Sequence, residues 1–338
     1  MSRLILHIGT HKTATTTLQR HFARNRAALA ARGIWYPDYD LIGKGGHYAH
    51  LGMVNAFAGQ HDKYSVEDAR NFFREVGARV RDHEVTLISG EPFYRHIAYR
   101  SPGQVPEDPE IYWPLRDAYI EQIREAFGDV PAEIAVVFRR QVDYAPSLYQ
   151  EQVKVTRYAQ DFATFRREFW YHFDYLGQAR AWARVFGTLH VLRFEDLVSG
   201  GDPVAAFGAL LGLDLSGPET VAQQNVSMHP DAVVLKRLLH ATKIDKDVLR
   251  ADIEKMLEGP LRRRVRKFSN RSLYADAADM QAFHRSFRRD NEYLGREFFP
   301  GFAPGSQLFS DRLKEDLRFG DELHPYFLNM MLKELIRR

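Results

Sequence analysis

The 338-residue sequence contains no cysteine. Disulfide bonds, thiolate nucleophiles and cysteine-ligated zinc are therefore excluded. It also lacks any apolar run long enough to cross a membrane, and the apolar residues after Arg3 are too few for the core of a secretory signal peptide. We therefore expect a soluble, cytoplasmic protein with no membrane span.

Neither sign of charge is in large excess, since 47 Lys and Arg face 44 Asp and Glu for a net charge of +3. A charge this small does not indicate a nucleic-acid partner. The one basic run, at 262–267, has no interleaved aromatic platform and no recognised nucleic-acid module. This run is read either as a solvated helix face or as a lid over a cofactor or an anionic acceptor. We expect no nucleic acid among the partners.

The first strand and helix of the chain enclose a polar loop. Residues 4–8 form an apolar run typical of a buried strand, and a helical pattern begins at Thr15 and continues to Gly33. The start of a helix presents unpaired N–H groups and the positive end of the helix dipole, so it suits an anion. Lys12 and the neighbouring threonine hydroxyls add charge and donors. The sequence predicts a site for a phosphate-like ligand here.

The spacing of this loop differs from that of a Walker A motif. Counting from Gly9, Ala14 occupies the second glycine position and Thr15 the lysine position, so the nucleoside-triphosphatase pattern fails at its cation. With Lys12 in mid-loop and three threonines after Ala14, the segment resembles the 5′-phosphosulfate loop of sulfotransferases that use PAPS (3′-phosphoadenosine 5′-phosphosulfate). The bacterial members with an H-K-T-G-T-T loop are most similar. Ala14 replaces their glycine, so it either has ordinary backbone angles or changes the loop shape.

Three further apolar runs predict strands, and helical patterns lie between them. Because strands alternate with helices, we expect a three-layer α/β/α fold with a central, mostly parallel sheet, which is the P-loop-like fold of the sulfotransferases. Segment 101–114 reads as a surface loop. The predicted strands are 85–89, 134–138 and 189–194, and the predicted helices are 65–83, 115–127 and 161–186.

The strand at 134–138 ends in Arg139 and Arg140, where a Walker B strand would end in an acidic magnesium ligand. Ser147 follows Arg139 by eight residues, which resembles the 3′-phosphate site of the PAPS sulfotransferases. By that resemblance Arg139 and Ser147 bind the 3′-phosphate. The segment at 194–197 is similar to the [YF]-E-D-L segment of the same family. The implied donor-binding residues are His11, Lys12, Thr13, Ala14, Thr15, Thr16, Thr17, Arg139 and Ser147.

A general base is needed to take a proton from the acceptor. Glu91 is the first candidate, because it follows the strand at 85–89 where cytosolic sulfotransferases carry a histidine. His47 and His50, in a Gly-rich loop, are the reserve candidates, and Lys12 is the candidate for stabilising the leaving group. His47 and His50 form an H-x-x-H pair, but no third metal ligand is evident, so no metal site is expected.

After residue 225 the sequence shows helical patterns only. We therefore expect a PAPS-binding core at 1–215 and a helical extension or lid at 216–338. An amphipathic helix at 323–335 leaves two arrangements open, packing on the same chain or on a second copy in a homodimer.

The resemblance implies a sulfotransferase that moves a sulfuryl group from PAPS to a hydroxyl or amine of an acceptor and releases 3′,5′-ADP. The acceptor is expected to be a small molecule or glycan, a carbohydrate or another hydroxylated metabolite, and no metal is required. Two alternatives stay open: a nucleotide or phosphometabolite kinase on a related fold, and a non-catalytic sulfonucleotide-binding protein.

Overall fold

The computed structural model describes residues 2–99, 105–219, 228–257 and 270–336. The basic run at 262–267 lies outside them. The chain forms two compact units, each assembled from three stretches: Met1–Arg139, Tyr171–Gln224 and Asp290–Leu308 in the first, and Arg140–Trp170, Asn225–Arg289 and Phe309–Arg338 in the second. The division predicted at residue 215 stays a prediction.

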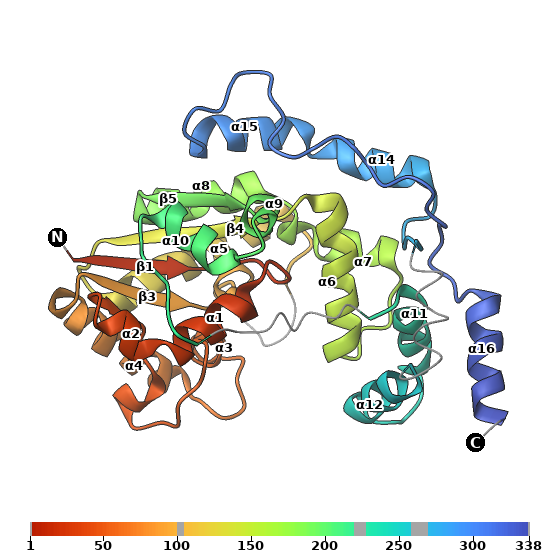
Figure 1. Cartoon of the computed structure of the whole chain (residues 1–338), viewed down its shortest axis with the longest axis horizontal. Helices are drawn as coiled ribbons and strands as arrows, with labels where there is room; N and C mark the ends of the chain where they lie inside the picture. The colour runs from red at the N-terminus through yellow and green to blue at the C-terminus, as the bar shows by residue number, and fades with distance from the viewer. Residues whose placement is uncertain (1, 100–104, 220–227, 258–269, 337–338) are drawn as a thin grey trace. The chain divides into compact units, whose positions relative to one another are not determined.

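A five-stranded sheet forms the centre of the first unit, and all of its pairings are parallel. The strand order is β2-β3-β1-β4-β5, so β1 lies in the middle (Figure 1). Strands buried on both faces are mostly apolar, as the sequence indicated. The predicted α/β class is confirmed. The strands are β1 (Arg3–His7), β2 (Ile34–Trp35), β3 (Val85–Ser89), β4 (Ala132–Phe138) and β5 (Leu189–Arg193).

Helices cover both faces of this sheet (Figure 1). Helices α1 (Thr15–Arg24) and α10 (Pro203–Leu211) place Leu18, Phe22 and Phe207 in one core cluster with apolar residues of β1, β3, β4 and β5. At the other face α8 (Tyr175–Phe186) packs on β4 and β5, next to α5 (Pro109–Phe127) and α4 (Val66–Arg79). The carboxyl ends of parallel strands lie at one edge of the sheet, where α/β proteins bind ligands.

Two predicted helices are interrupted. The helix expected from Thr15 to Gly33 stops at Asn25, whose side chain bonds the carbonyl of His21 and both backbone groups of Glu219. A short α2 (Arg26–Ala30) follows. The stretch 161–186 divides into α7 (Phe162–Glu168), η4 (Trp170–His172) and α8, because the Asp174 side chain caps a new helix by accepting from the N–H of Gly177.

The loop predicted at 101–114 is wrong in its second half. Helix α5 begins at Pro109, six residues earlier than the sequence suggested. Asp108 caps its N-terminus by accepting from the N–H of Glu110, and Pro109 occupies the first turn, where a missing N–H costs nothing. The Asp-Pro pair was the available start signal.

In the described residues of the second unit the regular elements are helices, apart from an isolated bridge between Arg271 and Arg318. Its core cluster joins Ala232 and Ile253 to Phe327, Met330 and Met331 of the C-terminal helix. That helix therefore packs within its own unit, and a homodimer stays a prediction. The helices in the described part of this unit are α6 (Gln141–Val155), α7, α11 (Pro230–Leu239), α12 (Lys246–Met256), α14 (Ala277–Ser286) and α16 (Pro325–Ile336).

Shorter elements complete the described chain. In the parts of the chain that the structure describes, no helix combines the length and the apolar character needed to span a membrane. The remaining elements are η1 (Tyr39–Ile42), α3 (Leu51–Phe57), η2 (Val80–Asp82), η3 (Glu91–Tyr94), α9 (Phe194–Ser199) and α15 (Arg288–Phe298).

Candidate active site

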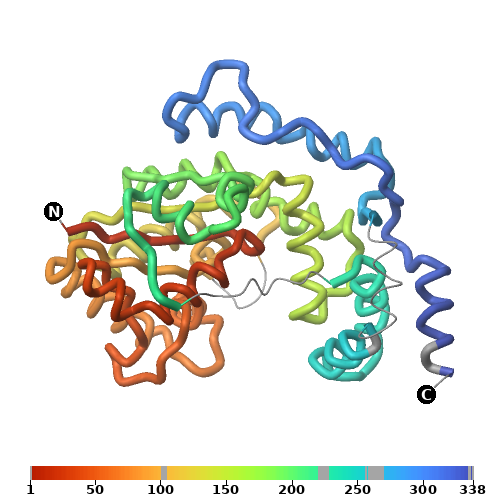
Figure 2. The backbone as a smooth tube through the Cα atoms, in the orientation of Figure 1, coloured from red at the N-terminus to blue at the C-terminus, as the bar shows by residue number. Residues whose placement is uncertain are grey.

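The loop between β1 and α1 has an unusual backbone. Gly9, Lys12 and Ala14 all have positive φ, at 44°, 65° and 63°. A left-handed alanine is disfavoured by roughly 1–2 kcal/mol, so the surrounding structure imposes the conformation. The question left open at Ala14 is thereby answered: the alanine takes the left-handed conformation that glycine adopts easily. Figure 2 shows this turn at the end of the red β1 segment.

Threonine hydroxyls hold the loop from within. The Thr10 hydroxyl donates to the carbonyl of Val137 on β4 at 2.8 Å, and the Thr13 hydroxyl donates to the carbonyl of Thr10 at 2.6 Å. Both side chains are buried. Thr13 thus uses its hydroxyl to shape the loop.

The N-terminus of α1 has no side-chain cap. The first backbone hydrogen bonds of the helix are donated by the N–H groups of Thr17 and Leu18 to the carbonyl of Ala14, at 3.0 and 3.1 Å. Thr15 and Thr16 come before Thr17 in the first turn of α1. Because the first N–H groups of a helix have no acceptor within the helix, these two N–H groups have none there. In α4 and α10, by contrast, Ser65 and Asp202 accept such bonds.

Alternating left-handed residues before a helix turn successive N–H groups toward one concave side, which is a common way to bind anions. The loop and the uncapped α1 supply this arrangement together. Lys12 and His11 lie on it and are partly exposed. These residues are suited to hold a phosphate or a sulfuryl group.

Glu91 lies directly against this loop. It is 6% exposed, and its carboxylate accepts hydrogen bonds from the Thr15 hydroxyl and, at 3.0 Å, from Nε2 of Gln19. Burial raises the pKa of Glu91, but the charge of His11 and the bonds from Thr15 and Gln19 outweigh burial, so that pKa lies below its ordinary value. Glu91 is therefore ionised at neutral pH.

Two residues that the sequence did not single out extend the network under the loop. His7 ends β1, Ser89 ends β3, and the two are register partners. Nδ1 of His7 lies 2.8 Å from the Ser89 hydroxyl, which also accepts from Gln19 at 3.2 Å. Burial lowers the pKa of His7 to about 4, so this ring is neutral at pH 7. In the sequence, the signal that could have indicated this role was a histidine within an otherwise apolar strand.

Gly9 permits the close packing at this point. A β-carbon there would lie 2.9 Å from Cγ2 of Thr15, 3.4 Å from Cγ of Glu91 and 3.5 Å from Nε2 of His7. Its positive φ adds a second reason for glycine. The loop, the carboxylate and the strand end are thus in direct contact.

His50 is buried with its ring against the backbone, and the role of reserve base predicted for it stays a prediction. It is 1% exposed, its Nε2 donates to the carbonyl of Pro37 at 3.0 Å, and its Nδ1 accepts from the N–H of Ser89 at 2.9 Å. Both ring nitrogens are therefore engaged by the backbone. Burial lowers the pKa of His50 to about 4. The residue joins the Gly-rich loop to the end of β3.

His47 is partly exposed and stacks on Tyr39 and Tyr48, with ring centroids 6.1 and 4.4 Å away. Its Nδ1 lies 2.9 Å from the carbonyl of Ala49. The role predicted for His47 stays a prediction. Among the residues described, no group of three or more side chains could hold a metal ion.

Arg139 follows the end of β4 directly. Its guanidinium lies 5.1 Å from the ring centroid of Phe194, and its carbonyl accepts from the Tyr175 hydroxyl at 2.6 Å. These contacts fix the backbone and the side chain of Arg139 separately. Ser147 lies on α6 in the second unit, and its pairing with Arg139 stays a prediction.

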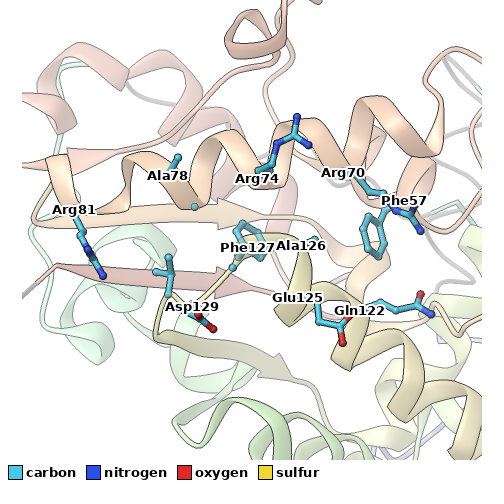
Figure 3. Close-up of a pocket in the computed structure, with 13 residues that line it drawn as sticks. Phe57, Arg70, Arg74, Ala78, Arg81, Gln122, Glu125, Ala126, Phe127 and Asp129 are labelled. Atoms are coloured by element: carbon cyan, nitrogen blue, oxygen red, sulfur yellow. The ribbon is translucent and has the colours of Figure 1, made fainter.

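A separate groove of about 690 Å³ lies between α4 and α5 (Figure 3). Its walls carry Arg70, Arg74 and Arg81 on one side and Glu125 and Asp129 on the other. It contains none of the predicted site residues. We therefore place the candidate site at the loop and not at this groove.

Comparison with known proteins gives little further information. No protein-family model matches the chain, and no curated protein matches its sequence. A solved structure of a sulfotransferase from Alicyclobacillus acidocaldarius is 18% identical, with 74% of this chain and 99% of that chain covered and a TM-score of 0.40. A likeness this distant carries no weight for the function, which has to be inferred from the residues themselves.

Proposed function

We propose that the chain transfers a sulfuryl group from PAPS to a hydroxyl or amine of an acceptor and releases 3′,5′-ADP. The observation that carries the proposal is the loop: Lys12 and Ala14 are left-handed, and α1 begins without a side-chain cap. This geometry suits an anion, and the mid-loop lysine matches the phosphosulfate loop rather than a Walker A loop.

Lys12 and the loop N–H groups have the role of stabilising the leaving group. As the bond from sulfur to the bridging oxygen breaks, negative charge grows on that oxygen. Donors fixed there stabilise the transition state more than the ground state. The hydroxyls of Thr10 and Thr13 hold the loop in shape, so little rearrangement is needed during the reaction.

Glu91 takes the proton of the acceptor. The acceptor oxygen forms its bond to sulfur, its proton passes to the carboxylate, and 3′,5′-ADP leaves with the bridging oxygen. The two carboxylate oxygens have four lone pairs between them, and the bonds from Thr15, from Gln19 and from the backbone N–H of Glu91 itself use three of them. One lone pair is left for the acceptor. The lowered pKa keeps Glu91 ionised and ready to accept this proton.

Arg139, and Ser147 by resemblance, select the donor by binding its 3′-phosphate. The cation that follows β4 supports this role, because adenine nucleotides without that phosphate would leave it unused. The acceptor is a small molecule or glycan, a carbohydrate or another hydroxylated metabolite.

A thermal-shift comparison tests the proposal. A ligand that binds only the folded state raises the melting temperature. We expect 3′,5′-ADP to stabilise the protein more than ADP or ATP, with no dependence on Mg²⁺. Stabilisation by ATP that requires Mg²⁺ would favour a kinase instead. Binding of 3′,5′-ADP with no transfer to any acceptor would favour a non-catalytic protein.

A further inference from the structure

A cluster of basic side chains lies behind the segment that follows Glu91. Arg116 is completely buried, and its guanidinium donates to Oε1 of Gln178 at 2.9 Å, to the carbonyl of Phe93 at 2.8 Å and to the carbonyl of His96. All three acceptors are neutral. Its Nη2 is buried and has no hydrogen-bond partner. Arg116 therefore fixes this segment, and its charge is not neutralised by any of these acceptors.

Arg95 adds a second cation of the same kind. Its Nη2 and the Nε2 of His96 both donate to Oδ1 of Asn55, at 3.1 and 2.8 Å. Nε of Arg95 is buried without a partner, although the side chain as a whole is partly exposed. Within the described residues, neither Arg95 nor Arg116 forms an ion pair with a carboxylate.

The cluster reaches the loop through His172. The ring of His172 lies 6.5 Å from that of His11, and its carbonyl accepts from the Tyr94 hydroxyl at 3.3 Å. Burial lowers the pKa of His172 well below its ordinary value, and the charges of His11, Arg95 and Arg116 lower it further. Positive charge from both the loop and the cluster therefore acts at this ring.

Buried cations are costly unless they are paired. An anion beside Arg95 would meet a buried N–H donor and a region of positive charge. We propose that Arg95, backed by Arg116 and lying beside His96 and His172, binds an oxyanion carried by the acceptor, a carboxylate or a sulfate ester. This inference rests on the proposed sulfuryl transfer and names its acceptor class: hydroxylated molecules that already carry an acidic group.

Matched pairs of acceptors test the inference. Sulfuryl transfer from PAPS is measured for methyl glucuronide against methyl glucoside, glucose 6-sulfate against glucose, and 4-hydroxybenzoate against 4-hydroxybenzamide. We expect higher kcat/KM for the acidic member of at least one pair. The first and third pairs test a carboxylate, and the second tests a sulfate ester.

Variants assign the preference to the cluster. In Arg95→Gln the ratio of kcat/KM for the acidic and neutral members should fall about tenfold or more, the effect expected of one charge-assisted hydrogen bond. Arg95→Lys keeps the charge and should retain part of the ratio. Arg74→Gln, an equal loss of charge on the exposed face of α4, should leave the ratio unchanged.

The outcomes separate this inference from the proposed function. If 3′,5′-ADP fails to stabilise the protein, sulfuryl transfer itself is wrong. If 3′,5′-ADP binds but no acidic acceptor is preferred, or if the preference survives in Arg95→Gln, only the anionic acceptor is wrong.

Discussion

Replacing Glu91 with glutamine tests the chemistry proposed for the site. The change keeps the shape of the side chain but puts an NH₂ donor where a carboxylate oxygen now accepts from Thr15 or Gln19. If the NH₂ faces Gln19, one buried donor meets another. If it faces Thr15, the hydroxyl has to turn and accept instead of donating. Leaving a buried hydrogen-bonding group unsatisfied costs about 1–3 kcal/mol, so we expect the free energy of unfolding to fall by that amount.

The effect on turnover should be larger than the effect on stability. A positioned general base contributes about 10² to 10⁴ in rate, and an amide cannot take the proton. We therefore expect kcat of Glu91→Gln to fall by about that factor at saturating PAPS, with the affinity for 3′,5′-ADP changed little. Urea unfolding, calorimetry and steady-state rates measure the three quantities.

Thr15→Val is the matched control. It removes the same hydrogen bond from its other end, keeps a β-branched side chain and leaves the carboxylate in place. We expect a comparable loss of stability with less than about a tenfold loss of kcat, since the base is kept. If the two variants lose kcat equally, Glu91 holds the loop and is not the base.

Three further results are expected. Lys12→Ala should lower kcat far more than it weakens 3′,5′-ADP binding, and a normal rate would show that Lys12 only positions the donor. Arg139→Ala should weaken 3′,5′-ADP binding about tenfold or more, the ~1.5–3 kcal/mol of a charge-assisted hydrogen bond, and calorimetry measures this affinity. The control is Arg193→Ala, which should bind 3′,5′-ADP normally, because Arg193 lies at the end of β5 and is ion-paired with Asp196. The pKa of His50 is lowered to about 4 in the folded protein, so as the pH falls the unfolded chain binds a proton at this residue before the folded chain does. The free energy of unfolding should therefore fall as the pH falls from about 6.5 to about 4, by roughly 1.4 kcal/mol per pH unit. In urea unfolding at several pH values, His50→Gln should show a shallower dependence, and an unchanged slope would contradict this assignment.

Local sequence patterns predicted most of the fold. The strands β1, β3, β4 and β5 are mostly apolar, and the helical patterns between them imply a parallel sheet. The short β2 was missed because two residues give no periodic signal. The early start of α5 was missed although Asp108 and Pro109 form a recognisable start signal.

The candidate site was only partly predictable. Lys12 and the polar loop are visible from spacing alone, and so is a carboxylate just after a strand. The contact of Glu91 with Thr15 and Gln19 depends on the pairing of β1 with β3, which brings residues more than 70 positions apart together. His50 lies in a Gly-rich segment that reads as an exposed loop, yet its ring is buried between that loop and β3. Burial of this kind is a tertiary property that no local pattern reports.

Calorimetric titration with 3′,5′-ADP and with ADP, both in the presence of EDTA, tests the central claim most directly. If the loop and Arg139 form a PAPS site, 3′,5′-ADP binds at least about tenfold more tightly than ADP, because only it offers a 3′-phosphate to a charged donor. Equal affinities, or binding of ADP that appears only when Mg²⁺ is restored, would contradict the proposal that this chain is a PAPS-dependent sulfotransferase.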